Sequence, residues 1–205
     1  CDRFVQADLE KFCQASDYRE QVVQGIRDAL PKQGLNALIN NAAIQIVKTT
    51  DSLTANDWHT TLDVNLVAPF LLTQQLLPEL EGASGAVVNI ASIHAQLTKP
   101  EFVGYATSKA ALVGLTKSLA VDLGPRIRVN AVCPAAVETP MLVAGLEGKE
   151  DSLNILASMH PINRIAKTEE IANAAVFLVS DRSSFMTGEV LNICGGIDAS
   201  LHDPV

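Results

Sequence analysis

A short apolar run followed directly by a long helical pattern constrains this fold more than any other feature. Residues 86–91, Ala-Val-Val-Asn-Ile-Ala, are apolar apart from one asparagine, which is typical of a buried strand. Further on, apolar side chains recur with a helical period at Ala110, Leu112, Val113, Leu115, Leu119 and Leu123. Such strand–helix units build α/β proteins, whose open sheets bind ligands where strands end and helices begin.

The rest of the chain repeats this alternation. Further strands are expected at residues 35–40, 126–133 and 189–193, and a short one at the front, within residues 4–9. Further amphipathic helices are expected at residues 17–30, at residues 55–80 and in a stretch that Thr168 caps. Thr54 or Asn56 is expected to cap the helix over residues 55–80, and Pro69 to kink it and free backbone carbonyls near Asn65.

Composition bounds the class of protein. With 205 residues the chain can bury one good core, so we predict a single domain over residues 1–205. A net charge of -8 argues against nucleic acid or an acidic membrane surface as a partner. No apolar run approaches the length of a membrane span. Four scattered cysteines without metal-ligand spacing predict free thiols, no metal site and a cytoplasmic protein.

Three residues around this strand and helix can act together. Ser92 ends the strand, while Tyr105 and Lys109 lie a turn apart near the start of the helix. A free tyrosine has a pKa of about 10, and a nearby ammonium favours the phenolate, so we expect Lys109 to lower the pKa of Tyr105. Ser92 can hydrogen-bond the same substrate oxygen. The three suit interconversion of a small-molecule alcohol and a carbonyl, with a nicotinamide cofactor carrying the hydride.

Motifs along nearly the whole chain carry a resemblance to a known family. In chain order they are Asn40-Asn41-Ala42-Ala43, Asn65, Ser92, Tyr105 with Lys109, Pro134 with Val137, Thr139 and Met141, Thr187-Gly188 and Gly195-Gly196. Together they resemble the short-chain dehydrogenase/reductase family, in its common subtype near 3-oxoacyl-carrier-protein reductases and sugar dehydrogenases. The resemblance implies a Rossmann-like doubly wound parallel sheet and an oxidoreductase that uses NAD or NADP.

The resemblance also assigns roles. The implied catalytic residues are Asn65, Ser92, Tyr105 and Lys109, with the backbone carbonyl of Asn65 holding a water that links the lysine to solvent. The implied cofactor contacts are Asp8, Leu9, Asn41, Ala42, Ala43, Tyr105, Lys109, Pro134, Val137 and Thr139. For Asp8, capping of a helix or plain surface exposure is the alternative.

Residues near the catalytic trio and after Pro140 are expected to meet the substrate. His94, Gln96, Phe102 and Val103 flank the trio and are candidates for substrate contact. Residues 140–165 have an irregular pattern, and a mobile lid is expected there.

The chain departs from the family pattern at several positions. Ala43 and Ala135 stand where the family has glycine, and Cys194 where it has aspartate. Strain is expected at Ala135, because alanine tolerates positive φ poorly. No glycine-rich turn precedes Asp8, so we expect the sheet to lack its first two strands and first helices. Cofactor affinity would then suffer, and the choice between NAD and NADP cannot be read.

The expected strand order has a consequence for the sheet edge. In the family order 3-2-1-4-5-6-7, loss of strands 1 and 2 turns residues 35–40 into an apolar edge. We expect one of three outcomes for this edge: residues 4–7 pair with it, another chain pairs with it, or an oligomer covers it. The helices over residues 55–80 and 101–123 are the family's usual faces for a homodimer or homotetramer. A second reading is a non-catalytic chain that folds and oligomerises but binds no dinucleotide.

Overall fold

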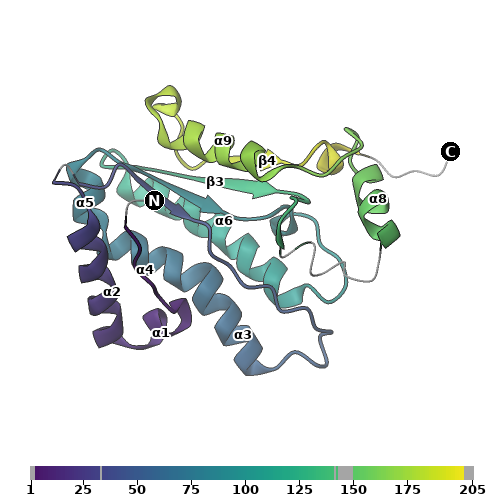
Figure 1. The fold of residues 1–205 in the computed structure, drawn as a ribbon, viewed down its shortest axis with the longest axis horizontal. Helices are drawn as coiled ribbons and strands as arrows, with labels where there is room; N and C mark the ends of the chain where they lie inside the picture. The colour runs from purple at the N-terminus through teal and green to yellow at the C-terminus, as the bar shows by residue number, and fades with distance from the viewer. Residues whose placement is uncertain (1–2, 33, 141, 143–149, 201–205) are drawn as a thin grey trace.

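Four parallel strands form one sheet in the computed structural model, which describes residues 3–32, 34–140, 142 and 150–200 (Figure 1). The strands are β1 (Ala37–Asn40), β2 (Ala86–Ile90), β3 (Arg128–Pro134) and β4 (Val190–Ile193), and they lie in the order β1-β2-β3-β4. The two central strands, β2 and β3, are almost fully buried, as expected for a parallel sheet covered on both faces. The α/β fold with a Rossmann-like parallel sheet is therefore confirmed.

Helices cover the two faces unequally. The first layer holds α1 (Leu9–Gln14), α2 (Ser16–Ala29), α3 (Ala55–Leu62), α4 (Ala68–Gln75), α5 (Leu77–Gly82) and α6 (Val103–Leu123). On the other side of the sheet lies α9 (Thr168–Val179), and α8 (Glu150–Ser158) stands beyond the ends of β3 and β4 (Figure 1). Strand alternation sets this division, because Val87 packs against the α5–α6 side and its neighbour Val88 packs against α9.

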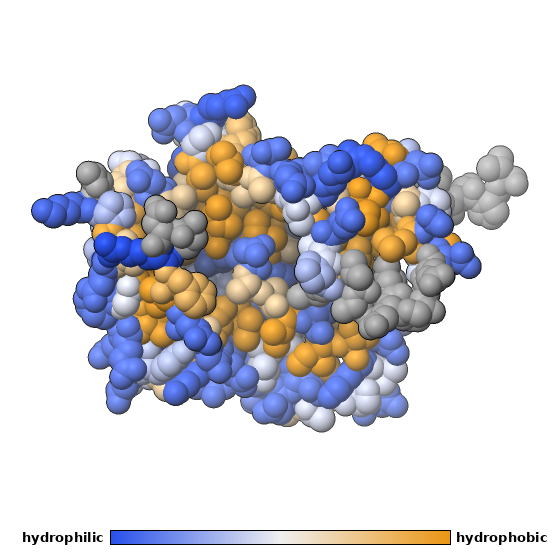
Figure 2. All heavy atoms as spheres, in the orientation of Figure 1, coloured by the Kyte–Doolittle hydropathy of each residue, from blue (hydrophilic) through white to orange (hydrophobic). Residues whose placement is uncertain are grey.

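The edge strand β1 is only partly covered. Ile39 pairs in register with the fully buried Val88, yet 42% of Ile39 is exposed. Apolar surface is visible over the strands below α9 in Figure 2. The expected strand at residues 4–7 is wrong, because these residues are irregular and Val5 packs beside Gly25 of α2. Pairing of the edge with another chain, or cover by an oligomer, stays a prediction.

The expected single helix over residues 55–80 is divided. Thr54 caps α3, accepting from Asp57 N while the Asp57 carboxylate accepts from Thr54 N, so Thr54 and not Asn56 is the cap. A π-helical turn, Asp63–Val67, then separates α3 from α4. Pro69 has no N–H to give the carbonyl of Asn65, four residues earlier, so the α-helical bond expected there cannot form. The structure thus has a π-turn where a kink was expected, and backbone carbonyls freed near Asn65 stay a prediction.

Two smaller expectations also meet the structure. Thr168 is the first residue of α9 rather than its cap, and the Glu170 carboxylate accepts from the backbone N–H of Lys167 instead. The front half of the expected lid falls largely on Met141 and residues 143–149, which lie outside the described residues. The rear half of the expected lid contains α8. Within the described chain no helix is long and apolar enough to cross a membrane.

Candidate active site

The structure brings Ser92, Tyr105 and Lys109 together at the carboxyl end of β2. Ser92 follows β2, and the other two residues lie in the first two turns of α6. Ser92 lies close enough to Tyr105 for its hydroxyl to lower the pKa of the phenol. Lys109 is 2% exposed, its Nζ lies 5.8 Å from the centre of the Tyr105 ring, and it donates to the carbonyl of Ile90 at 2.8 Å. The predicted trio is therefore one cluster, in which Ser92 and Lys109 are buried and Tyr105 is partly buried.

The electrostatics of this cluster differ from the expectation. Burial raises the pKa of the Tyr105 phenol, against the effect of Ser92, which lowers it. Burial also lowers the pKa of Lys109 to about 8. The expected lowering of the phenol pKa by the ammonium is wrong for this structure, because withdrawal of the phenol from water outweighs the effect of Ser92, which lowers its pKa. Tyr105 is thus a neutral phenol at physiological pH.

Asn65 joins the cluster through its side chain. It lies in the π-turn and is 1% exposed. Its Oδ1 accepts from Ile44 N at 2.9 Å, and its Nδ2 donates to Ile44 O at 2.9 Å and to the Ser108 hydroxyl at 3.0 Å. The π-turn is thereby fixed both to the segment that follows β1 and to α6.

The expected nicotinamide-end contacts gather at the same edge of the sheet. Asn41, Ala42 and Ala43 follow β1, and Pro134 is the last residue of β3. Beyond β3, Val137 forms a parallel bridge with Ala166. Because the strands are parallel, these segments leave the sheet on the side where Ser92 leaves β2. Thr139 lies further along, and its hydroxyl accepts from Leu142 N at 3.3 Å.

The two residues expected at the adenine end have local partners. Asp8 is the N-cap of α1, and its carboxylate accepts from Lys11 N at 3.1 Å. Leu9 opens α1 and packs in the cluster around Phe12. The structure therefore gives Asp8 the capping role that the sequence had left open, and contact with a cofactor stays a prediction for both residues.

The departures from the family pattern are accommodated. Ala135 is not among the described residues with positive φ, so the expected strain there is absent. Cys194 donates through its thiol to the Asp198 carboxylate at 2.8 Å.

His94 and Phe102 both pack against Tyr105, with ring centres 5.9 Å away in each case.

The four candidates for substrate contact do not all face the trio. His94 and Phe102 also stack on each other, with ring centres 4.7 Å apart. Burial, and then the charge of Lys99, lowers the pKa of His94, which favours the neutral imidazole. Gln96 turns its amide toward Asn192, with which it exchanges hydrogen bonds. Val103 is 40% exposed at the start of α6. His94 and Phe102 are therefore the pair best placed beside the phenol.

Two buried residues next to the trio were missed by the sequence reasoning. Ser108 is fully buried and directly precedes Lys109, and Cys133 is fully buried at the end of β3. The Cys133 thiol acts on the pKa values of both Tyr105 and Lys109. Ser108 had a usable signal, since it lies four residues before Leu112 on the buried face of the helix. Cys133 had none beyond its place in an apolar run.

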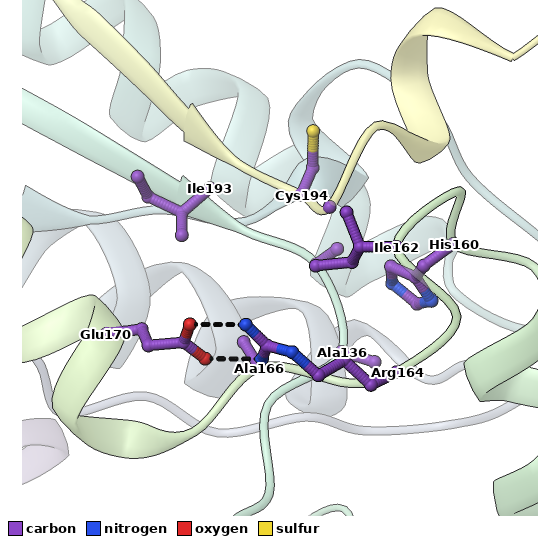
Figure 3. Close-up of a pocket in the computed structure, with 10 residues that line it drawn as sticks. Ala136, His160, Ile162, Arg164, Ala166, Glu170, Ile193 and Cys194 are labelled. Carbon is purple, nitrogen blue, oxygen red and sulfur yellow. Dashed lines mark hydrogen bonds and ion pairs between the residues drawn. The ribbon is translucent and has the colours of Figure 1, made fainter.

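A separate small pocket lies behind the segment that leaves β3. Its lining comes from residues 135–136 after β3, residues 193–195 at the end of β4, the stretch 160–166 and Glu170 of α9, and Ser92, Tyr105 and Lys109 are not part of it. Figure 3 shows Arg164 and Glu170 joined across it by two contacts of 2.7 Å, with His160 beside Ile162. His160 Nδ1 bonds to Leu156 O at 2.8 Å, and Gly195 is held closely between His160 and Ile162. These contacts around the pocket hold the stretch 160–166 against the sheet.

Comparison with known proteins gives consistent similarities. A family model described as enoyl-(acyl carrier protein) reductase matches residues 4–198. The 3-oxoacyl-[acyl-carrier-protein] reductase FabG of Thermotoga maritima is 36% identical over 182 residues, which are 87% of this chain and 73% of that protein. Trans-4-hydroxycyclohexanecarboxylate dehydrogenase of Sinomonas cyclohexanicum is 39% identical over 79% of this chain and 60% of its own length.

Solved structures show the same fold. Ligand-free aldohexose dehydrogenase of Thermoplasma acidophilum superposes with a TM-score of 0.90 at 30% identity, covering 98% of this chain and 80% of that one. A 4-hydroxyisoleucine dehydrogenase complexed with NADH has a TM-score of 0.85, also at 30% identity, over 96% of this chain and 79% of its own.

Proposed function

Because the chain belongs to the short-chain dehydrogenase/reductase family, we propose that it is an NAD- or NADP-dependent oxidoreductase that interconverts an alcohol and a carbonyl. The observation that carries the proposal is the cluster in which Ser92 lies beside the phenol of Tyr105 and the ammonium of Lys109 lies 5.8 Å from the centre of the same ring. A proton donor, an orienting hydroxyl and a cation around one point suit a reaction in which an oxygen gains or loses a proton.

In the reductive direction each residue has a defined task. The cofactor, when bound, supplies the hydride that reaches the carbonyl carbon. The carbonyl oxygen then takes its proton from the Tyr105 hydroxyl, while Ser92 hydrogen-bonds that oxygen. The raised pKa of Tyr105 keeps the phenol protonated at neutral pH, as a general acid must be, but a pKa further above the operating pH makes it a weaker proton donor. Asn65 anchors the relay that returns a proton to the phenol through Lys109.

The residues present fit the nicotinamide end of a dinucleotide. Lys109 has three donors, of which one is used by Ile90 O, so two remain for ribose hydroxyls. Ala42 and Ala43 are small enough for a ligand to approach the backbone, and Val137 and Thr139 follow at the end of β3. Among residues 3–32 no glycine-rich turn opens a helix in the way that holds a pyrophosphate. The described residues therefore offer contacts for the nicotinamide end of the dinucleotide, through Lys109 and the segments that follow β1 and β3.

Titration with NADH and NADPH, followed by fluorescence, tests the proposal. Saturation at micromolar cofactor, followed by oxidation of NAD(P)H with a panel of ketones and aldehydes, is the expected result. Absence of binding at millimolar cofactor contradicts it, and favours the second reading of a chain that folds and oligomerises without a dinucleotide. Solved relatives described with NADH and with NADP support both cofactors equally, so the titration also decides between them.

We also propose a cytoplasmic homodimer or homotetramer formed through the helices within residues 55–80 and 101–123. Exposed apolar side chains on these helices support it, since Phe70 of α4 is 36% exposed and Val121 of α6 is 85% exposed. The free thiols of Cys13, Cys133 and Cys194 suit a reducing compartment. Light scattering coupled to size-exclusion chromatography should give two or four times the mass of one chain. A monomer at micromolar concentration would contradict the proposed oligomer.

A further inference from the structure

We propose that Ser108 is a positioning residue that fixes Tyr105 relative to Asn65, an inference that rests on the function proposed above. Ser108 is fully buried. Its hydroxyl donates to the backbone carbonyl of Tyr105 at 2.7 Å and accepts from Asn65 Nδ2 at 3.0 Å. One side chain thus links the helix turn that carries the phenol to the π-turn that carries Asn65.

The link continues to the segment that follows β1. Both Asn65 N–H groups are used, one on Ser108 and one on Ile44 O, and Asn65 Oδ1 accepts from Ile44 N. A serine hydroxyl has one proton to donate, and here it goes to Tyr105. Because every donor in this chain of bonds is committed, Ile44, Asn65 and Tyr105 have one relative arrangement.

The first turn of α6 needs such an anchor. Phe102 occupies the N-cap position and makes no side-chain capping hydrogen bond. The first turn of a helix has N–H groups without partners in the helix, and a turn without a capping side chain is more free to fray. Tyr105 is the third residue of this helix, so its position depends on contacts made by the turns that follow. Ser108 supplies one that reaches across to another helix.

The same helix offers a matched control two turns further on. Thr116 is fully buried, donates to Leu112 O at 2.8 Å and accepts from Asn89 Nδ2 at 2.9 Å. Ser108 and Thr116 therefore share burial, a bond to their own helix and an asparagine donor from a neighbouring element. Only Ser108 acts next to Tyr105, so a comparison of the two separates positioning from general stability.

The experiment compares Ser108→Ala with Thr116→Val in a Tyr18→Phe background, in which Tyr105 is the one remaining tyrosine. Alanine is a better helix former than serine, so Ser108→Ala does not weaken α6 through helix propensity. We expect kcat to fall about tenfold in Ser108→Ala with KM changed less, because misplacement of a reacting group by about 1 Å can cost about 100-fold. Thr116→Val should lower stability and leave kcat within about twofold, since Thr116 lies outside the site.

A titration of the phenol by ultraviolet absorbance gives a readout that needs no turnover. Ser92 lowers the pKa of Tyr105, so a phenol that moves away from Ser92 should titrate at higher pH in Ser108→Ala. Lys109, Cys133 and His94, the other titratable groups around the phenol, are unchanged in both variants. Thr116→Val should titrate as the parent does.

The possible outcomes separate the two proposals. Ser108→Ala with the parent's phenol titration and an equal loss of stability to Thr116→Val overturns the positioning role, whatever the activity. A shifted titration in Ser108→Ala, when the parent itself oxidises no NAD(P)H, supports the positioning role and refutes the proposed function. A shifted titration together with lowered kcat supports both.

Discussion

Lys109 should leave the folded protein no more stable at neutral pH than the same chain with methionine in its place. Lys109 is 2% exposed, and burial lowers the pKa of its ammonium to about 8 from the 10.5 of a free lysine. Between these two pH values the unfolded chain holds a proton that the folded chain has released, so stability rises with pH across this window. At pH 7 both states hold the proton, and the folded state carries the full cost of the buried charge.

The size of this cost follows from the two pKa values. At about 1.36 kcal/mol for each pH decade, the charge on Lys109 lowers the free energy of unfolding at pH 7 by about 3 kcal/mol. Lys109→Met removes the charge and so raises the free energy of unfolding. It also removes the donor to Ile90 O, and loss of that hydrogen bond lowers the free energy of unfolding by about 1–3 kcal/mol. The variant is therefore expected to be as stable as the parent or more stable at pH 7, and to be inactive.

Urea unfolding of both proteins at several pH values between 7 and 10.5 isolates this effect. The free energy of unfolding of Lys109→Met relative to the parent should fall by about 3 kcal/mol across the series. The Lys109 charge lowers the pKa of the Cys133 thiol, so Cys133→Ala is introduced into both proteins to keep that titration out of the difference. A difference that stays constant with pH would refute the reasoning, because Lys109 would then have the same pKa folded and unfolded.

Three further substitutions have defined outcomes. Ser92→Ala should lower kcat about 100-fold or more by removing a hydrogen bond to the reacting oxygen, and steady-state kinetics at constant cofactor would show no loss if Ser92 were only structural. Thr54→Ala should lower the free energy of unfolding by about 1 kcal/mol through loss of the α3 cap with kcat retained, and unchanged urea unfolding would count against the cap. Gly195→Ala should cost about 1–3 kcal/mol, because Gly195 has φ +57 and its added Cβ would meet Ile162 at 3.1 Å; a thermal midpoint equal to the parent's would contradict that crowding.

Much of the fold could be predicted from apolar periodicity. The runs that became β1, β2, β3 and β4 are short, apolar and followed by helical or turn patterns, so local sequence and tertiary structure agree there. Residues 4–7 read equally as a strand, but they lie against α2, and which elements pair is a tertiary property that alternation alone does not fix. Pro69 correctly indicated an interruption of the helix over residues 55–80, although the structure has a π-turn there where a kink was expected.

The candidate site was predictable in identity more than in energetics. Ser92, Tyr105 and Lys109 carry recognisable spacing, and the structure brings them together. The direction of the Tyr105 pKa depends on how deeply the ring is buried and where the Lys109 ammonium points, and neither can be read from spacing. Ser108 was missed for a related reason, since a buried hydroxyl on a helix gains its meaning only from Asn65 on another element.

The central claim is that the phenol of Tyr105 passes a proton to and from the substrate oxygen, and Tyr105→Phe tests it most directly. The ring should stay packed against His94 and Phe102, so the loss of one hydroxyl should change the free energy of unfolding by no more than about 1.5 kcal/mol. Carbonyl reduction at saturating NADH or NADPH should fall by about 100- to 10,000-fold, with cofactor affinity little changed. A folded Tyr105→Phe protein that reduces its substrate at the rate of the parent would contradict the account.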